Sequence, residues 1–111
     1  MDSIRQQKIS RIIQKEISIV LDQKFNHLFL GSLVTVTACE TSPDLSLSKI
    51  YLSIFNAEKK EVLESISSYN KEIRFELGKK IKNKLRKVPE LLFIIDDSME
   101  RASRIDELLK K

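Results

Sequence analysis

The first pattern along the chain is that of an amphipathic helix over residues 3–24. Its apolar side chains recur three or four positions apart, which places them on one face of the helix. They are Ile9, Ile12, Ile13, Ile17 and Val20. Ser3 can cap the first turn. Glu16 falls within the apolar face, where an unpaired carboxylate is costly, and we expect it to pair with Arg74, which falls in the apolar phase of a later helix.

The pattern then changes to the alternation of strands. Residues 33–40 and 48–55 alternate apolar and polar side chains, which is the period of a half-buried strand. The short TSPDLS stretch between them is rich in turn-forming residues, so we expect an antiparallel pair. Residues 91–95 are apolar throughout, which favours a third strand in a central position, covered on both faces.

A long helical pattern fills the chain between the second and third strands, over residues 57–87. Its buried face is expected to comprise Val62, Ile66, Tyr69, Ile73, Leu77, Ile81 and Leu85. The SSYNK stretch at 67–71 contains weak helix formers, so we predict two helices that meet at a kink near Asn70. Val88-Pro89 ends the second of them. A last short helix is expected to begin near Asp97 or Ser98.

These elements follow one another as α-β-β-α-kink-α-β-α. Such an order predicts an α+β domain in which helices cover one face of a three-stranded sheet. The chain has 111 residues, 41% of them hydrophobic, which is enough for one core. We therefore expect a single domain over residues 1–111.

Positive charge is concentrated in one segment, although the net charge is only +4. Residues 79–87 include six Lys or Arg, and no acid lies between residues 77 and 89. On a continuous helix, Lys80, Lys84 and Lys87 would project to one side of the apolar stripe and Lys79, Lys82 and Arg86 to the other. The first helix adds a basic strip of Lys8, Arg11 and Lys15. Like charges this close repel one another, a cost that a phosphate backbone relieves. The pattern favours a polyanion-binding surface over a merely solvated helix face.

Enzymatic and metal-binding functions have little support in the sequence. The single histidine, His27, has no partner at a spacing typical of a catalytic triad, and Cys39 lies on a predicted strand, where a packing role is expected. We expect no enzyme activity, no metal and no cofactor. The N-terminus lacks a signal core, and no uncharged run reaches the ~20 residues of a membrane span, so a cytoplasmic location without membrane contact is expected.

Short motifs in a fixed order give the chain a family resemblance. They are Lys15-Glu16-Ile17, Ser42-x-Asp44-Leu45, Lys49-Ile50-Tyr51-Leu52-Ser53, Ile73-Arg74, Val88-Pro89-Glu90-Leu91-x-Phe93, Asp96-x-Ser98 and Arg104-Ile105. Over nearly its whole length the chain resembles the ribosome-binding factor A family. The resemblance implies a KH-like domain (type II) with a helix–kink–helix in place of the GxxG loop, and it adds Asn70 and Lys71 at the kink to the candidate RNA-binding residues.

The same resemblance implies a function and partners. These are binding to the immature 30S small subunit and its 16S rRNA, late maturation and 5′-end processing of that rRNA, and cold adaptation. Assembly GTPases acting on the same particle are implied as further partners, and the chain is expected to be a monomer. Two stretches depart from the family pattern. Tyr69-Asn70-Lys71 replaces a small-x-Gly kink, and His27-Leu28-Phe29 replaces Asp-Pro-Arg. We therefore expect no RNA contact from the loop at residues 27–29.

Two other functions remain open. One is a general KH-like module that binds RNA or single-stranded DNA without ribosomal specificity. The other, a peripheral membrane protein, has less support, because no bulky apolar residues flank the basic segment on its exposed side, as an interfacial helix requires.

Overall fold

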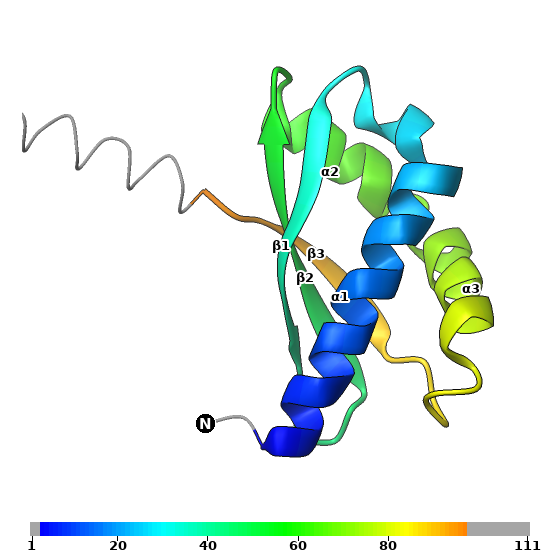
Figure 1. Ribbon diagram of the computed structural model, residues 1–111. Helices are drawn as coiled ribbons and strands as arrows, with labels where there is room; N and C mark the ends of the chain where they lie inside the picture. Colours follow the sequence, from blue (N-terminus) through cyan, green and yellow to red (C-terminus); the bar gives the residue numbers. More distant parts are fainter. Residues whose placement is uncertain (1–2, 98–111) are drawn as a thin grey trace, which may run out of the picture.

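The computed structural model describes residues 3–97, which form three helices, a short 3-10 helix and three strands (Figure 1). In chain order they are α1 (Ile4–Lys24), η1 (Asn26–Phe29), β1 (Leu33–Thr41), β2 (Leu47–Phe55), α2 (Lys59–Ser67), α3 (Asn70–Ile81) and β3 (Glu90–Ile95). The strands and the first helix lie within two residues of their expected bounds. The expected last helix lies outside the described residues.

The sheet is mixed and has the order β1-β2-β3, and α1, α2 and α3 all lie on one of its faces (Figure 1). β1 and β2 pair antiparallel, as expected, whereas β2 and β3 pair parallel. The predicted central position of residues 91–95 is therefore wrong, because β2 is the central strand. Leu91 and Phe93 are buried against the helices, but Leu92 is 46% exposed on the opposite face. An apolar side chain on the uncovered face made an edge strand resemble a central one.

α1 forms for the reasons that its sequence indicates. The Ser3 hydroxyl accepts a hydrogen bond from the Gln6 amide N–H, and the Gln6 side chain accepts one from Ser3 N–H, which is a complete capping box. Ile13 and Ile17 are fully buried at the centre of the core. Gln6 Nε2 also donates to the carbonyl of Thr41 at 3.0 Å, which fixes the start of α1 to the end of β1.

The helix break predicted near Asn70 is confirmed. α2 ends at Ser67 and α3 begins at Asn70. The side chain of Asn70 donates to the carbonyl of Leu91 at 2.9 Å and so ties the break to β3. Among the described residues, positive backbone φ angles occur elsewhere, and the break forms without one. Tyr69 is 43% exposed, not buried as expected, and its ring contacts His27 edge-on.

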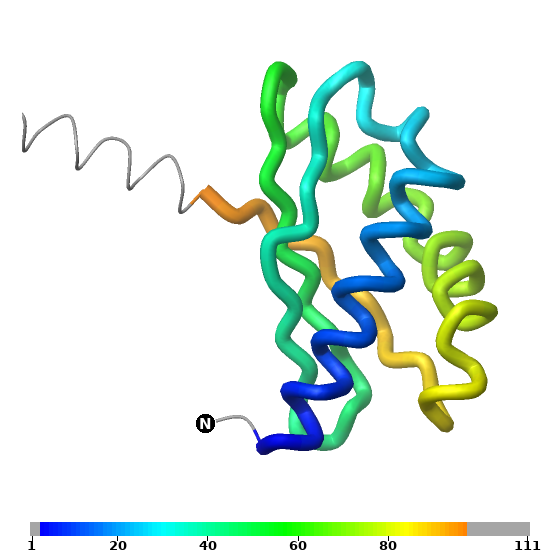
Figure 2. Tube along the Cα trace, in the orientation of Figure 1, coloured from blue at the N-terminus to red at the C-terminus, as the bar shows by residue number. Residues whose placement is uncertain are grey.

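α3 is shorter than predicted, because it ends at Ile81 and not near residue 87. The chain must reverse direction between α3 and β3, and Figure 2 shows this turn in yellow at the lower end of the helix. A helix that continued to Lys87 would leave only two residues for the reversal. Fold geometry therefore overrides the helical periodicity that extends to Leu85.

The predicted ion pair between Glu16 and Arg74 is wrong, since each group has other partners. Arg74 Nη2 donates to the carbonyl of Val88 at 2.6 Å, and its Nε donates to the carbonyl of Pro89 at 3.0 Å. Glu16 Oε1 lies 3.7 Å from Nζ of Lys84. Both groups avoid unpaired burial, as expected, but α3 uses its arginine to hold the chain that follows it.

Candidate nucleic-acid interface

The segment between α3 and β3, residues 82–89, carries most of the concentrated charge, and we call it the cationic loop. Its backbone begins with a turn in which the N–H groups of Lys84 and Leu85 donate to the carbonyl of Ile81. Leu85 packs against the core, and Pro89 is fully buried. All four charged side chains of the loop are exposed to solvent. They are Lys82, Lys84, Arg86 and Lys87.

Close packing against α3 holds the second half of the cationic loop. A Cβ atom on Gly78 would lie 3.3 Å from Val88 Cγ2, so the absence of a side chain at Gly78 allows the loop to approach the helix. The two Arg74 hydrogen bonds to the carbonyls of Val88 and Pro89 fix the same stretch. These contacts, and not helical phase, determine where the cations of the loop point.

A first groove of about 620 Å³ lies between α1 and the cationic loop, and we call it the α1 groove. It has an apolar floor that includes Ile9 and Pro89. Its cationic lining residues are Arg5, Lys8, Lys84, Arg86 and Lys87. The fold thus brings Lys8 from the basic strip of α1 next to three predicted cations of the loop. Arg5 was missed, although it stands three residues before Lys8 and extends the same spacing.

A second groove, of about 960 Å³, lies between α3 and the cationic loop, and we call it the α3 groove. Six predicted site residues line it. They are Asn70, Lys71, Lys79, Lys82, Arg86 and Lys87. Arg86 and Lys87 line both grooves, so the cationic loop is a wall that the two grooves share. The groove also runs alongside the helix break, since Asn70 is the first residue of α3.

Three predicted site residues lie apart from the grooves. Arg11 and Lys15 are exposed on α1, and Lys80 is exposed on α3, but none of them lines either groove. The predicted grouping of Lys80 with Lys84 and Lys87 is therefore wrong, because it assumed that one helix carries all three.

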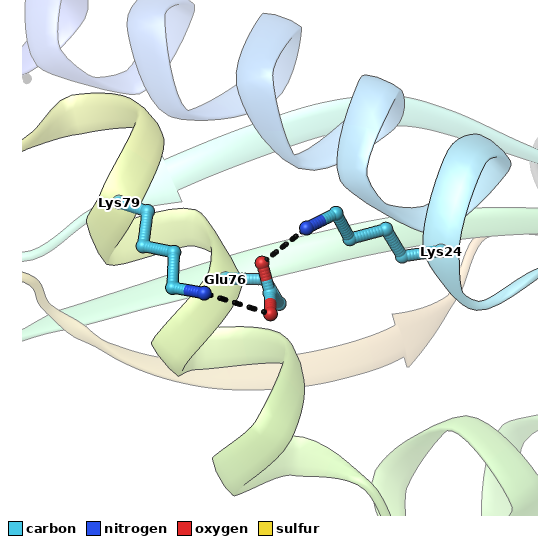
Figure 3. Close-up of polar contacts among 3 residues, drawn as sticks. All are labelled: Lys24, Glu76 and Lys79. Carbon is cyan, nitrogen blue, oxygen red and sulfur yellow. Dashed lines mark hydrogen bonds and ion pairs between the residues drawn. The ribbon is translucent and has the colours of Figure 1, made fainter.

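Acidic groups compensate only part of the concentrated charge. Glu76 accepts a hydrogen bond from Lys24 Nζ at 2.7 Å and lies 3.4 Å from Lys79 Nζ, as Figure 3 shows. The hydrogen bond from Lys24, and then that from Lys79, lowers the pKa of Glu76. Glu16 similarly partners Lys84.

The other cations of residues 79–87 form no ion pair with any residue in the described part of the chain. They are Lys80, Lys82, Arg86 and Lys87. Their mutual repulsion makes anion binding favourable at the cationic loop.

The turn between β1 and β2 lies against the α1 groove and is stabilised by Asp44. Its carboxylate accepts hydrogen bonds from the Ser42 hydroxyl at 2.7 Å, from the Ser46 hydroxyl at 2.7 Å and from Ser46 N–H at 3.2 Å. These bonds, that from Ser42 first, lower the pKa of Asp44 from 3.8 to about 2. The ionised carboxylate therefore contributes stability above about pH 4, and this contribution is lost as the pH falls towards 2.

Replacing Asp44 with alanine should therefore destabilise the domain in a pH-dependent way. At pH 6 the variant should unfold at a lower urea concentration than the parent, and the difference should shrink between pH 4 and pH 2. Urea unfolding followed by circular dichroism across this range measures it. Ser42→Ala should reproduce part of the effect and add little to Asp44→Ala. A difference in unfolding midpoint that stays constant down to pH 2 would show that the ionised carboxylate of Asp44 is not its source.

Other kinds of site have no support within residues 3–97. No group of three or more His, Cys, Asp or Glu side chains is placed there to hold a metal ion. None of the described helices has the length and apolar character needed to cross a bilayer. Cys39 is half-buried, and burial raises the pKa of its thiol to about 11, which disfavours the reactive thiolate.

The fold and the grooves define a class of protein. Three helices on one face of a three-stranded mixed sheet, with a helix break beside a groove, form a KH-like α+β domain. The family model of ribosome-binding factor A matches residues 5–109. Ribosome-binding factor A of Cytophaga hutchinsonii is 38% identical over 112 residues, covering 100% of this chain and 84% of that protein. The chain belongs to the ribosome-binding factor A family.

Solved structures share the fold. The crystal structure of ribosome-binding factor A from Thermus thermophilus matches with a TM-score of 0.66 at 21% identity, covering 81% of this chain and 94% of that chain. A homology model of the Thermus thermophilus factor, fitted into the cryo-EM map of its 30S complex, matches with a TM-score of 0.60 at 23% identity and covers 87% and 97% of the two chains.

Proposed function

We propose that this chain is a non-catalytic assembly factor that binds the 30S ribosomal subunit through its 16S rRNA. The observation that carries the proposal is the cationic loop, whose Lys82, Arg86 and Lys87 line the α3 groove and form no ion pair within residues 3–97. Membership in a family named for ribosome binding supplies the partner. A homology model of the Thermus thermophilus factor, which has the same fold, has been fitted into the cryo-EM map of a 30S complex, and we extend that partner to this chain.

The binding mode follows from the kind of surface. A helical rRNA segment exposes phosphates and 2′-hydroxyls, and it is recognised mainly by charge and shape. The cations of the two grooves would contact such phosphates, with Asn70 and Lys71 at the helix break.

The finer role that we propose comes from the family resemblance. The factor would act as a cytoplasmic monomer on immature subunits, assist late maturation and 5′-end processing of 16S rRNA, and support growth in the cold. Assembly GTPases would act on the same particle. Binding alone is sufficient for this role, because an occupied rRNA segment is held back from its mature contacts until the factor leaves.

A second candidate function is a general RNA- or single-stranded-DNA-binding module. The α3 groove favours it in one respect, because lysine and arginine side chains contact phosphates of any sequence. Both candidates bind RNA through positive charge. They differ in whether the fold also makes the protein prefer the 30S subunit over other RNA.

Co-sedimentation with ribosomal particles separates these candidates. We expect the purified protein to sediment with free 30S subunits, and much less with assembled ribosomes or bare rRNA. If six to eight phosphates are contacted, affinity should fall by about three to five decades between 50 and 200 mM salt on the scale of duplex DNA. Equal binding to every RNA would support the general module, and binding to anionic vesicles would point to a membrane surface.

A further inference from the structure

The largest unexplained apolar side chain at the α3 groove is that of Phe75. It is 65% exposed, whereas Ile73 and Leu77, two residues before and after it, are fully buried. A separation of two residues places a side chain on the opposite side of a helix. The ring of Phe75 therefore lies on the outer surface of α3 and contributes little to the core.

Both lysines and glutamates lie near this ring. Nζ of Lys79 lies 4.7 Å from the ring centroid, and Lys71 stands one helical turn before Phe75. Lys71, Phe75, Lys79 and Lys82 all line the α3 groove. Lys71 and Phe75 also line a smaller hollow of about 290 Å³ on the other side, next to Phe25. The ring therefore stands between two hollows: lysines line the α3 groove, and Glu72 and Glu76 line the smaller hollow.

An isolated exposed apolar residue needs no special explanation, because such residues are common on protein surfaces. The combination here is different. Surfaces that bind single-stranded nucleic acid pair a positively charged groove with aromatic rings on which bases stack. In a duplex the faces of the bases are already stacked on one another, so only an unpaired base can lie on an exposed ring.

We propose that Phe75 is a stacking platform for an unpaired RNA base whose flanking phosphates lie on Lys71, Lys79 and Lys82. This inference rests on the proposed function and specifies its ligand: a single-stranded stretch of rRNA, not only a helical one. Lys71 and Lys79 lie about 6 Å along the helix axis on either side of Phe75, within reach of phosphates next to a stacked base.

The Lys79 contact is compatible with this role. Lys79 is held only weakly, because its side chain is exposed and both its contact with the ring and its ion pair with Glu76 at 3.4 Å are weak at such a site. When a base approaches, the ammonium group can move from the ring to a neighbouring phosphate while the base takes its place. In the free protein the ring is 65% exposed, with a cation already beside it.

The sequence offers a direct optical test, because the chain contains no tryptophan. Phe75→Trp would introduce a single tryptophan at the platform. We expect its fluorescence to be quenched on titration with a ten-nucleotide single-stranded RNA, and far less with the same strand lacking its bases or with a duplex. Phe55→Trp, at a 45% exposed position at the end of β2, is the matched control and should show no quenching.

Affinity measurements complete the test. Phe75→Ala should weaken binding of the intact strand by about 5- to 100-fold and leave binding of the abasic strand unchanged. Phe75→Tyr should restore affinity. Leu92→Ala removes a partly exposed apolar side chain on the far face of the sheet and should have no effect.

Three outcomes would overturn the inference. One is equal binding of intact and abasic strands by the parent protein, and another is an unchanged affinity of Phe75→Ala for the intact strand. The third is a loss of 30S co-sedimentation by Phe75→Ala while oligonucleotide binding is retained, which would assign the ring to a protein contact. The proposed function fails separately, if the parent protein does not co-sediment with 30S subunits.

Discussion

Replacing Lys82, Arg86 and Lys87 together with glutamine is expected to lower both the RNA affinity of this protein and the dependence of that affinity on salt. All three are exposed cations of the cationic loop, they line the α3 groove, and none forms an ion pair with another described residue. Log affinity falls linearly with log salt concentration, and each phosphate contact that is lost makes this slope less steep by about one unit. We expect a slope that is less steep by about two to three units and, at 0.1 M salt, an affinity lower by about 100-fold.

The control for this experiment removes charge elsewhere. Lys49 and Lys60 are exposed and line neither groove, and their replacement with glutamine should change the slope by less than one unit. Lys84 is left unchanged, because it lies 3.7 Å from the buried carboxylate of Glu16 and its loss would also affect folding. Filter binding across a salt series measures both variants. An unchanged slope in the triple variant would show that RNA phosphates do not contact these three side chains.

The largest expected loss of stability from a single charged residue is that of Arg74→Ala. The guanidinium group donates two hydrogen bonds, to the carbonyls of Val88 and Pro89, and hydrogen bonds to a charged group contribute more than neutral ones. We expect the free energy of unfolding to fall by about 2 to 3 kcal/mol. For a domain of this size, that lowers the melting temperature by roughly 10 to 20 °C.

Two further variants test whether geometry or charge is responsible. Arg74→Lys keeps the charge but lacks the planar group that reaches two carbonyls, so most of the loss should remain. Lys60→Ala removes an exposed cation from α2 and should melt within a few degrees of the parent protein. Calorimetry at low protein concentration gives all three melting temperatures. If Arg74→Ala melted like the parent protein but lost RNA binding, Arg74 would be a ligand-binding residue and not a structural one.

Local patterns predicted the elements of this fold well. The capping box at Ser3 and the isoleucine spacing of α1 are properties of neighbouring residues, and so is the break at Asn70. The alternation in residues 33–40 and 48–55 similarly depends on side chains that are close in sequence. Each of these features is determined over a few residues, and therefore the structure reproduces them closely.

Features that depend on distant parts of the chain were predicted less well. The edge position of β3 depends on which strand β2 pairs with, and the periodicity of residues 91–95 carries no such information. The early end of α3 results from the reversal towards β3. The partners of Glu16 and Arg74 depend on where the cationic loop lies, since both groups contact residues 84–89.

The candidate site was predicted in composition but not in arrangement. Every predicted cation is exposed, as a binding surface requires. The division into two grooves with Arg86 and Lys87 on their shared wall could not be predicted, because it follows from the irregular backbone of the cationic loop. Phe75 had a sequence signal that could have identified it: it is an aromatic residue out of phase with Ile73 and Leu77, and a lysine stands four residues before it and another four residues after it.

The attachment of the cationic loop at Ile81, Leu85 and Pro89 has a consequence for conformational entropy. Fixing the backbone of one residue costs about 1 to 2 kcal/mol, and here that cost is met when the domain folds. An RNA that reaches the loop has mainly lysine and arginine rotamers left to order. A flexible tail with the same charges would have to lose its backbone freedom on binding, and it would hold RNA with lower affinity per contact.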